Sequence, residues 1–583
     1  MNRGPLMNSG QRSVAWLLGW LCGGCVVSLC AAFTHADSVE TSDREGEGGQ
    51  ACVEFEYNYR DLTEQRESRL VFDAFADEQG KTIRHIRYES RDIFDESDPD
   101  ENNWLYRGFN ELHINTREPV IAGQLLFAEG DSLRESLVKE SERILRSRNY
   151  LTSAYIVPDV ICPDYIDLLV VTRDSWVTEP ELTFSHEGGE TESGIGLKDG
   201  NFLGSGDAIA IRYAQDLERS SVSYEYETDH FMQTRLSTRV YYAQKSDGED
   251  KAFRLERPFY ALQVPWAAGV STEDVSELSI IREGGDDINE FRHRNRDSEV
   301  YFGLAGRADS ELTRRWLVGI SREEDVFSAT EDTTLEAPQD RRGNYGWVGL
   351  EVIENRFATY KNLNQIQRTE DIAMGVNYNL RLGYGGSQLG NERDLIRYWG
   401  NYSNVIGVGE HHILQLHADL NGRHYQSPES IDSGTLGAEM AYNWFRDDQN
   451  RWYIKLRYDL GRNLEQYEQL TLGGGNGLRG YPIDYQRGER RYLFNLERRY
   501  FSDLHLFNIV RMGGVAYFDA GRAWDDNIEG QDNPHLSNVG LGLRFSSSKT
   551  KVGNVLHIDL AMPLADRTGL ESTQLLIKAE SSF

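Results

Sequence analysis

The sequence has no long hydrophobic run beyond its first 33 residues, little cysteine, and far fewer basic than acidic residues. Five cysteines occur in 583 residues, and 62 Lys and Arg oppose 94 Asp and Glu, for a net charge of −32. That negative charge gives no general attraction to a phosphate backbone and argues against a nucleic-acid partner. The lack of a further run of about 18 apolar residues excludes transmembrane helices from the remaining chain.

Short catalytic motifs are missing as well. The sequence contains no Gly-x-Ser-x-Gly, no His-Glu-x-x-His and no phosphate-binding Gly-x-x-x-x-Gly-Lys. His411 and His412 adjoin, but neighbours on a strand point to opposite faces and cannot chelate one metal ion. We therefore expect no catalytic residue, no metal site and no cofactor. A barrel hydrolase, with catalytic groups on separate strands, is the enzyme alternative.

Residues 1–36 predict an export signal peptide. Arg3 and Arg12 precede an apolar stretch from Ala15 to Phe33, and Thr34-His35-Ala36 offers small residues for cleavage after Ala36. A retained membrane anchor is the alternative for the apolar stretch.

The mature chain would keep two cysteines, because the other three lie within the apolar stretch. These two, Cys52 and Cys162, could form one disulfide in an oxidising compartment. Two free, buried thiols are the alternative.

A small α+β unit is expected between residues 80 and 176, after a partly flexible lead-in over residues 37–79. Strand-like patterns at 83–90 and 165–172 enclose two helical segments. In the second helix, Ser132 and Glu135 have capping-box spacing. Four apolar residues there should share one face and pack on a sheet: Leu133, Leu137, Ile144 and Leu145.

Beyond Pro180, apolar and polar residues alternate in segment after segment to the end of the chain. Over residues 371–384 the large apolar side chains share one face, and residues 452–460 divide in the same way. Those of 371–384 are Ile372, Met374, Val376, Tyr378, Leu380, Leu382 and Tyr384. A soluble sandwich also alternates, but several segments reach the ~9 to 11 residues of membrane-spanning strands. Lipid forbids open sheet edges, so such strands must close.

These patterns predict an all-β transmembrane barrel over residues 181–583. At about 25 residues per strand and turn, the barrel would have about 16 antiparallel strands. The last segment, LLIKAESSF, alternates up to the terminal Phe583.

Four motifs in the barrel region carry a family resemblance. They are GIGLKDGNFLGSGD at 194–207, the glycine-rich run LTLGGGNGLRGYP at 470–482, FNLERRYF at 494–501 and FDAG at 518–521. The glycine-rich run has too few side chains for a lipid-facing strand and must begin a loop. Together with the terminal Phe583, the order of these motifs resembles the outer-membrane assembly and translocation barrels typified by BamA, TamA and the two-partner-secretion transporters.

The resemblance implies specific residue roles. The loop would fold into the barrel lumen through a tip of Arg479, Gly480 and Tyr481, with Asp519 and Glu497 as the carboxylate partners of Arg479. The chemistry agrees, because a confined guanidinium needs fixed anionic acceptors that match its planar fork. The strand, helix, helix, strand, strand order of residues 80–176 likewise resembles a single periplasmic POTRA domain.

The resemblance implies a protein of the cell outer membrane with a periplasmic N-terminal domain. It would insert or translocate polypeptides, with membrane lipids and an unfolded or secreted polypeptide client as partners. A passive, plugged transport channel without a polypeptide client is the main alternative, and the barrel hydrolase is the second. The sequence indicates no oligomeric state.

Overall fold

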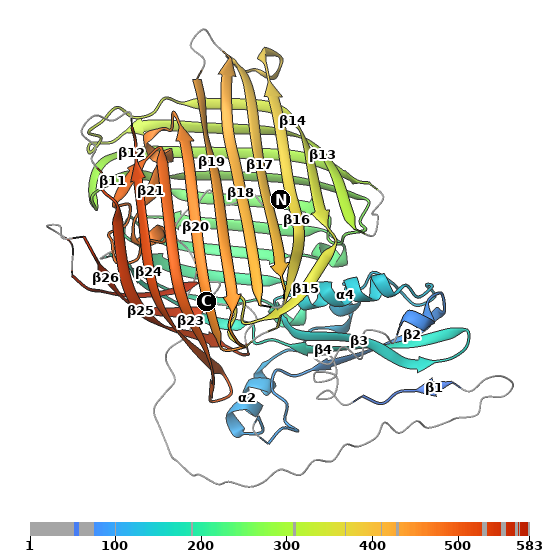
Figure 1. Ribbon diagram of the computed structural model, residues 1–583. Coiled ribbons are helices and arrows are strands. Elements are labelled where there is room, and N and C mark those ends of the chain that lie inside the picture. Colours follow the sequence, from blue (N-terminus) through green and yellow to red (C-terminus); the bar gives the residue numbers. More distant parts are fainter. Residues whose placement is uncertain are drawn as a thin grey trace.

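The computed structural model consists of a small N-terminal domain followed by a large β-barrel (Figure 1). It describes residues 52–57, 75–99, 101–187, 190–306, 311–367, 369–409, 411–426, 431–526, 533–549, 555–565, 570 and 572–580. The expected signal peptide, most of the expected lead-in and the terminal Phe583 lie outside these residues.

The N-terminal domain has a four-stranded sheet in the order β1-β3-β4-β2. Strand β2 is parallel to β4, whereas β1, β3 and β4 pair antiparallel. Its elements are β1 (Val53–Glu54), β2 (Thr82–Arg91), α2 (Trp104–Leu112), α3 (Glu118–Ala122), α4 (Glu135–Ser147), β3 (Leu151–Ile161) and β4 (Tyr165–Asp174). The expected order of elements is present, with the short α3 added, and β1 and Phe75 extend the domain into the expected lead-in.

Helix α4 packs on this sheet through its apolar face. Leu137 and Leu145 are buried with sheet residues such as Ile156, while Ile144 packs instead against the barrel. The expected capping box is wrong. The helix starts after Arg134 without a side-chain cap, and the Glu135 amide, which a capping box would direct to Ser132, donates instead to the Gln79 side chain at 3.3 Å.

Over the described residues the barrel is a closed antiparallel sheet of 20 strands, so the prediction of a closed barrel is confirmed and the number of about 16 is wrong. The count fails at the start of the barrel, where strands are short and turns tight. These strands are β5 (Thr178–Glu187), β6 (Glu190–Asp199), β7 (Ala208–Gln215), β8 (Ser220–Thr228), β9 (Ser237–Lys245) and β10 (Glu249–Arg257). They need far less chain than the ~25 residues assumed for each strand.

Most of the remaining wall strands are longer, and β15, β26 and β27 are the short ones among them. They are β11 (Trp266–Glu283), β12 (Asp286–Ala305), β13 (Leu312–Ala329), β14 (Arg341–Glu354), β15 (Arg356–Lys361), β16 (Thr369–Gly385), β17 (Asp394–Val408), β18 (His412–Gln426), β19 (Ile431–Phe445), β20 (Asn450–Arg462), β23 (Arg490–Leu506), β24 (Val510–Trp524), β25 (Leu536–Ser547), β26 (Val555–Pro563) and β27 (Gln574–Glu580). Strands β14 and β15 both pair with β16 and act as one wall strand. In the described chain, β27 and β5 close the barrel at a single paired position, Ile577 with His186.

The two faces of the wall differ as the alternation predicts. Large apolar side chains cover the outside, with Ile320 and Leu541 each 64% exposed. Charged side chains face inward and are buried, including Arg544 and Asp559, whose ion pair measures 2.7 Å. No helix among the described residues is long and apolar enough to cross a membrane.

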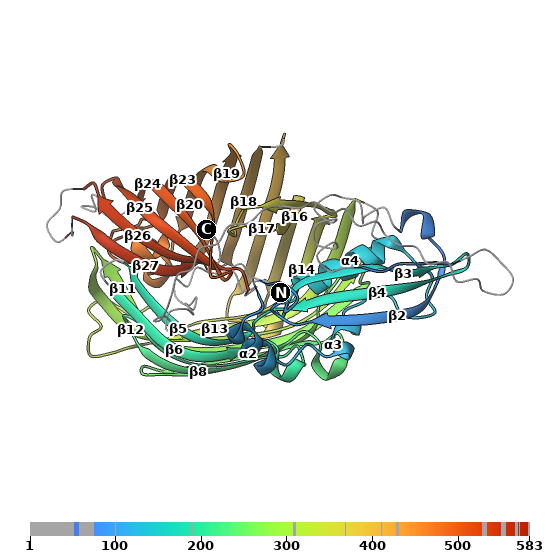
Figure 2. The same cartoon turned by 90° about the horizontal axis from the view of Figure 1, so that it is seen from below.

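The N-terminal domain lies against one end of the barrel, called here the domain end (Figures 1 and 2). The Tyr106 hydroxyl of α2 donates to the Phe507 carbonyl in the β23–β24 turn, and Asn201 donates to Thr116 at 2.8 Å. Ile144 of α4 packs on Ala261 in the β10–β11 loop. Figure 2 shows that the domain covers part of this end and extends beyond it. The opposite end is called the far end.

Candidate functional site in the barrel interior

The segment between β20 and β23, residues 463–489, folds into the barrel and is called here the lumen loop. Within it, β21 (Leu470–Leu472) pairs antiparallel with β22 (Gln486–Gly488), forming a small sheet separate from the wall. Leu472, Leu478 and Tyr481 are fully buried against the inner face of β23 to β25. The loop therefore has an apolar core of its own with the wall.

Arg479 is the centre of the loop's polar contacts. Its Nε and Nη2 atoms donate to the two carboxylate oxygens of Asp519 at 2.8 and 2.6 Å, and Nη2 also donates to Glu497 at 2.9 Å. The guanidinium carbon lies 3.4 Å from the centroid of the Tyr517 ring. Since Arg479 is 7% exposed and Asp519 0%, this charge-assisted cluster is shielded from water.

Neighbouring donors complete the cluster. Asn495 donates to Asp519 at 2.7 Å and to the Gly477 carbonyl at 3.2 Å. Arg499 donates to Glu497 at 2.7 Å. Both carboxylates thus accept from two side chains each, which offsets the cost of burying them. The structure brings together the three charged residues that the sequence motifs singled out.

Gly480 and Tyr481 fit the loop tip to the next two strands of the wall, β26 and β25. Gly480 has a φ of +80°, and a Cβ atom there would lie 2.9 Å from the Cβ of Ala561 on β26. The Tyr481 hydroxyl donates to the Ser537 carbonyl at 2.8 Å. A larger residue at position 480 would therefore strain the backbone and also meet the wall.

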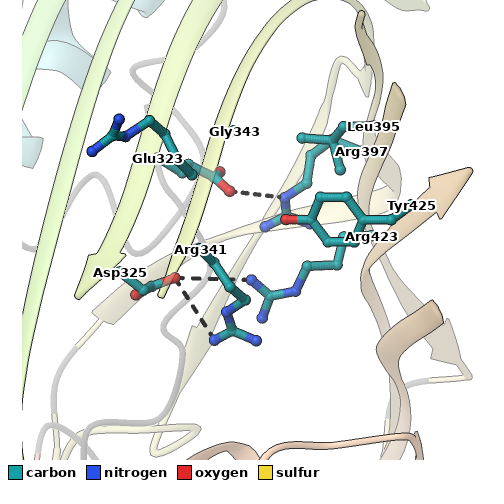
Figure 3. A pocket seen from close by; sticks show the side chains of 9 residues that line it. Glu323, Asp325, Arg341, Gly343, Leu395, Arg397, Arg423 and Tyr425 are labelled. Atoms are coloured by element: carbon teal, nitrogen blue, oxygen red, sulfur yellow. Dashed lines mark hydrogen bonds and ion pairs between the residues drawn. The ribbon is translucent and has the colours of Figure 1, made fainter. Parts of the chain in front are cut away.

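A second charged cluster, which the sequence did not reveal, lies on the inner wall of β13, β14, β17 and β18 (Figure 3). Arg341 and Arg423 turn toward Asp325, at 3.7 and 4.0 Å, and Arg397 donates to Glu323 at 3.2 Å. These residues are scattered over four strands, so no local motif marks them. Within the described residues, no group of three or more His, Cys, Asp and Glu could hold a metal ion.

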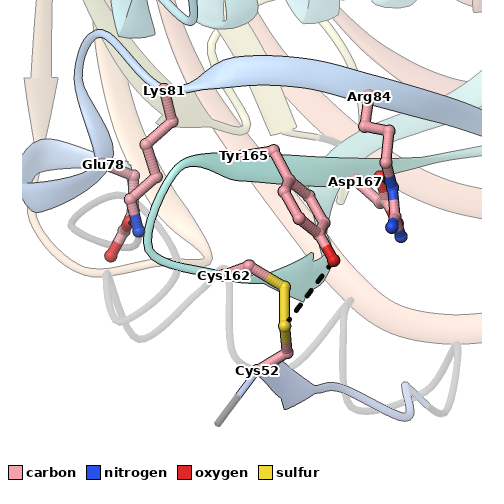
Figure 4. Close-up of a disulfide and its surroundings, with 7 residues drawn as sticks. All are labelled: Cys52, Glu78, Lys81, Arg84, Cys162, Tyr165 and Asp167. Carbon is pink, nitrogen blue, oxygen red and sulfur yellow. Dashed lines mark hydrogen bonds and ion pairs between the residues drawn. A yellow bond between two sulfur atoms is a disulfide. The ribbon is translucent and has the colours of Figure 1, made fainter. Parts of the chain in front are cut away.

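Cys52 and Cys162 form a disulfide in the N-terminal domain, with an S–S distance of 1.97 Å (Figure 4). It attaches the segment around β1 to the end of β3. The Tyr165 hydroxyl lies 3.7 Å from the Cys52 sulfur. The bond closes a long loop, which restricts the unfolded chain.

Glu101 connects this domain to the barrel. Its carboxylate pairs with Lys549 of the β25–β26 turn and with Arg173 at 3.0 Å. Burial acts to raise the pKa of Glu101, but the Asp95 amide, Lys549 and Arg173 together hold that pKa below its ordinary value. Burial lowers the pKa of Lys549, although Glu101 partly offsets this.

No family model and no curated protein matches this sequence. Among solved structures, the chain is similar to CdiB from Escherichia coli, with 11% identity and a TM-score of 0.44 over 90% of this chain and 84% of that one. It is also similar to BamA from Haemophilus ducreyi lacking POTRA domains 1–3, with 11% identity and a TM-score of 0.39 over 90% and 94% of the two chains. OccK2 (OpdF) from Pseudomonas aeruginosa has 12% identity and a TM-score of 0.32 over 68% and 93%. The neighbours thus include BamA, for which the motif resemblance was stated, and identities this low leave function to be argued from the site.

Proposed function

We propose that this chain inserts or translocates polypeptides at the outer membrane. The observation that carries the proposal is the buried cluster of Arg479, Asp519 and Glu497, with distances of 2.6 to 2.9 Å. Three motifs separated in the sequence, the glycine-rich run, the Glu-bearing strand and FDAG, supply one residue each. The two carboxylates are close in any case because β23 and β24 pair, so the supporting feature is that Arg479 of the separate loop reaches both of them.

In this proposal the barrel spans the outer membrane and residues 1–36 are removed on export. The apolar outer face, with residues such as Ile320 and Leu541, would contact lipid. The N-terminal domain would lie in the periplasm and act as a single POTRA-like unit, and the domain end of the barrel would be the periplasmic end.

A client polypeptide could be received at a sheet edge. Strand β2 is an outer strand of its sheet. Residues 130 and 131 cover its start through backbone hydrogen bonds to Ile83, and no strand of the described chain covers residues 87–90. An extended client segment could add there by main-chain hydrogen bonding. The β27–β5 junction, paired at one position among the described residues, offers a second place where strand pairing could be exchanged at low cost.

Depletion of the protein, followed by mass spectrometry of the outer-membrane and secreted proteomes, tests the proposal. We expect a defined set of these proteins to fall, and the wild-type gene to restore them. Arg479→Ala should not restore them even when the variant reaches the membrane in normal amount. An unchanged proteome with reduced uptake of small solutes would instead indicate the passive channel.

A further inference from the structure

Near its start, the lumen loop also contacts the side of the barrel wall that lies opposite Arg479. The Tyr467 ring lies among three aromatic rings of β12 and β13, with centroid distances of 6.2 Å to Phe291, 5.0 Å to His293 and 5.2 Å to Phe327. Beside it, Gln466 accepts a hydrogen bond from Asn289 of β12 at 2.9 Å. Tyr467 is thus held in an aromatic cage formed by side chains of β12 and β13.

Glu468 adds an ionic contact to the same wall. Its carboxylate accepts from Arg423 of β18 and, at 3.3 Å, from Arg341 of β14. The Tyr467 hydroxyl lies 3.4 Å from the same oxygen. Figure 3 shows Arg341 and Arg423 side by side, both turned toward Asp325. Without Glu468, these two cations would have Asp325 as the nearest acid, at 3.7 and 4.0 Å.

The loop's later part reaches the same side of the barrel. The Tyr485 carbonyl accepts from Gly284 at 3.0 Å, in the β11–β12 turn at the far end. Pro482 packs so close to Gly285 that a Cβ there would lie 3.0 Å from the Cβ of Pro482. Residues 463–489 therefore connect β23 and β24, through Arg479, with β11 to β14 and β18.

We propose that Tyr467 and Glu468 are a second attachment point that holds the lumen loop across the barrel. This attachment keeps the lumen closed in the half of the barrel that includes the far end. The two attachment points differ in burial. The side chains of Arg479 and Asp519 are 9% and 0% exposed, whereas those of Glu468 and Arg423 are 23% and 18% exposed. Because ion pairs that water can reach contribute less, the Tyr467–Glu468 end releases first while Arg479 still holds the tip. The inference concerns closure of the barrel and does not depend on a polypeptide client.

Conductance of the purified full chain in planar lipid bilayers tests this attachment. We expect Glu468→Gln and Tyr467→Ala to raise conductance several-fold over the wild type, because each removes one of the two side chains that attach the loop to this part of the wall. Two matched variants should stay closed. Glu465→Gln alters a carboxylate 3.8 Å from Arg341 that is already 41% exposed, and Tyr467→Phe keeps the ring in its cage.

Each variant is first checked for a heat-modifiable band on unboiled gels, which reports a folded barrel regardless of conductance. Wild-type conductance in both Glu468→Gln and Tyr467→Ala, with folding intact, would overturn the second attachment. An equal rise in Glu465→Gln would also overturn it, since the effect would then come from lost loop charge. The client experiment above uses different readouts, so either proposal can fail alone.

Discussion

Arg479 is a buried cation that two buried carboxylates share. Replacing it with Ala leaves Asp519 and Glu497 facing each other without their shared cation, inside a site where Asp519 is 0% exposed. Breaking such a buried pair costs about 3 to 5 kcal/mol. We expect Arg479→Ala to form a barrel with a lower thermal midpoint in detergent and with new protease cleavage between residues 473 and 482.

The partnership itself is tested by a double-mutant cycle. Asp519→Ala should resemble Arg479→Ala, and the double variant should be scarcely less stable than either single one. If the two losses simply add, Arg479 and Asp519 do not act as a pair.

Gly480 allows a second prediction at a single position. Gly480→Ala places a side chain at a φ of +80° and 2.9 Å from Ala561, which should destabilise the loop by about 1 to 3 kcal/mol. Gly409→Ala is the matched control, because its φ is also positive, +67°, but nothing lies within 4 Å of its added Cβ. Thermal unfolding should rank Gly480→Ala below Gly409→Ala, and an equal loss would show that the close approach to β26 is unimportant.

Inside the barrel, the sequence predicted the contacts between residues that stand in motifs. It did not predict contacts between residues that only the fold brings together. Arg479, Glu497 and Asp519 stand in recognisable segments, so their meeting could be expected. Glu468 and Arg423 meet because the start of the loop folds inward against β18, two strands away from β20 in the wall. No spacing in the sequence encodes that distance.

At the scale of single elements, α4 connects the two parts of the molecule. Leu145 is 0% exposed between the helix and the sheet, so Leu145→Ala should cost about 2 to 5 kcal/mol. Lys139→Ala on the outer side of the same helix is the control, since its side chain is 47% exposed. Hydrogen exchange in the full chain should speed up in β3 and β4 for Leu145→Ala only; protection of both strands at wild-type level would contradict the packing.

Periodicity predicted the apolar faces of elements better than it predicted their irregularities. The face of residues 452–460 is as expected, with Tyr458 40% exposed and its neighbour Asp459 3%. In residues 371–384, however, Leu382 is 57% exposed whereas Met374 is 8% exposed. Gly375, with a φ of +82°, interrupts the strand between them, and a binary apolar pattern cannot show where a backbone departs from regular pleating.

At the scale of the whole molecule, the closure of the barrel could be predicted from the sequence, but the number of its strands could not. Lipid requires a barrel without edges, whatever its circumference. Strand number depends on turn lengths, and the tight turns from β5 to β10 were not separable from the strands by alternation alone. Docking of the N-terminal domain on the barrel was equally hidden, because Glu101 and Lys549 are far apart in the chain.

That docking should depend on pH. The pKa of Glu101 is held below its ordinary value of 4.5, so its ionised form stabilises the docked state. For a lowered carboxylate pKa, this contribution is present above the ordinary pKa and is lost as pH falls through the lowered one. We expect hydrogen exchange of α2, corrected for the intrinsic effect of pH, to speed up as the pH is brought below about 4.5.

The variant Glu101→Gln distinguishes the effect of this carboxylate from that of all others. Its α2 should exchange faster than the wild type at neutral pH and respond much less to acid. If the variant and the wild type respond to acid alike, Glu101 is not the group that couples docking to pH.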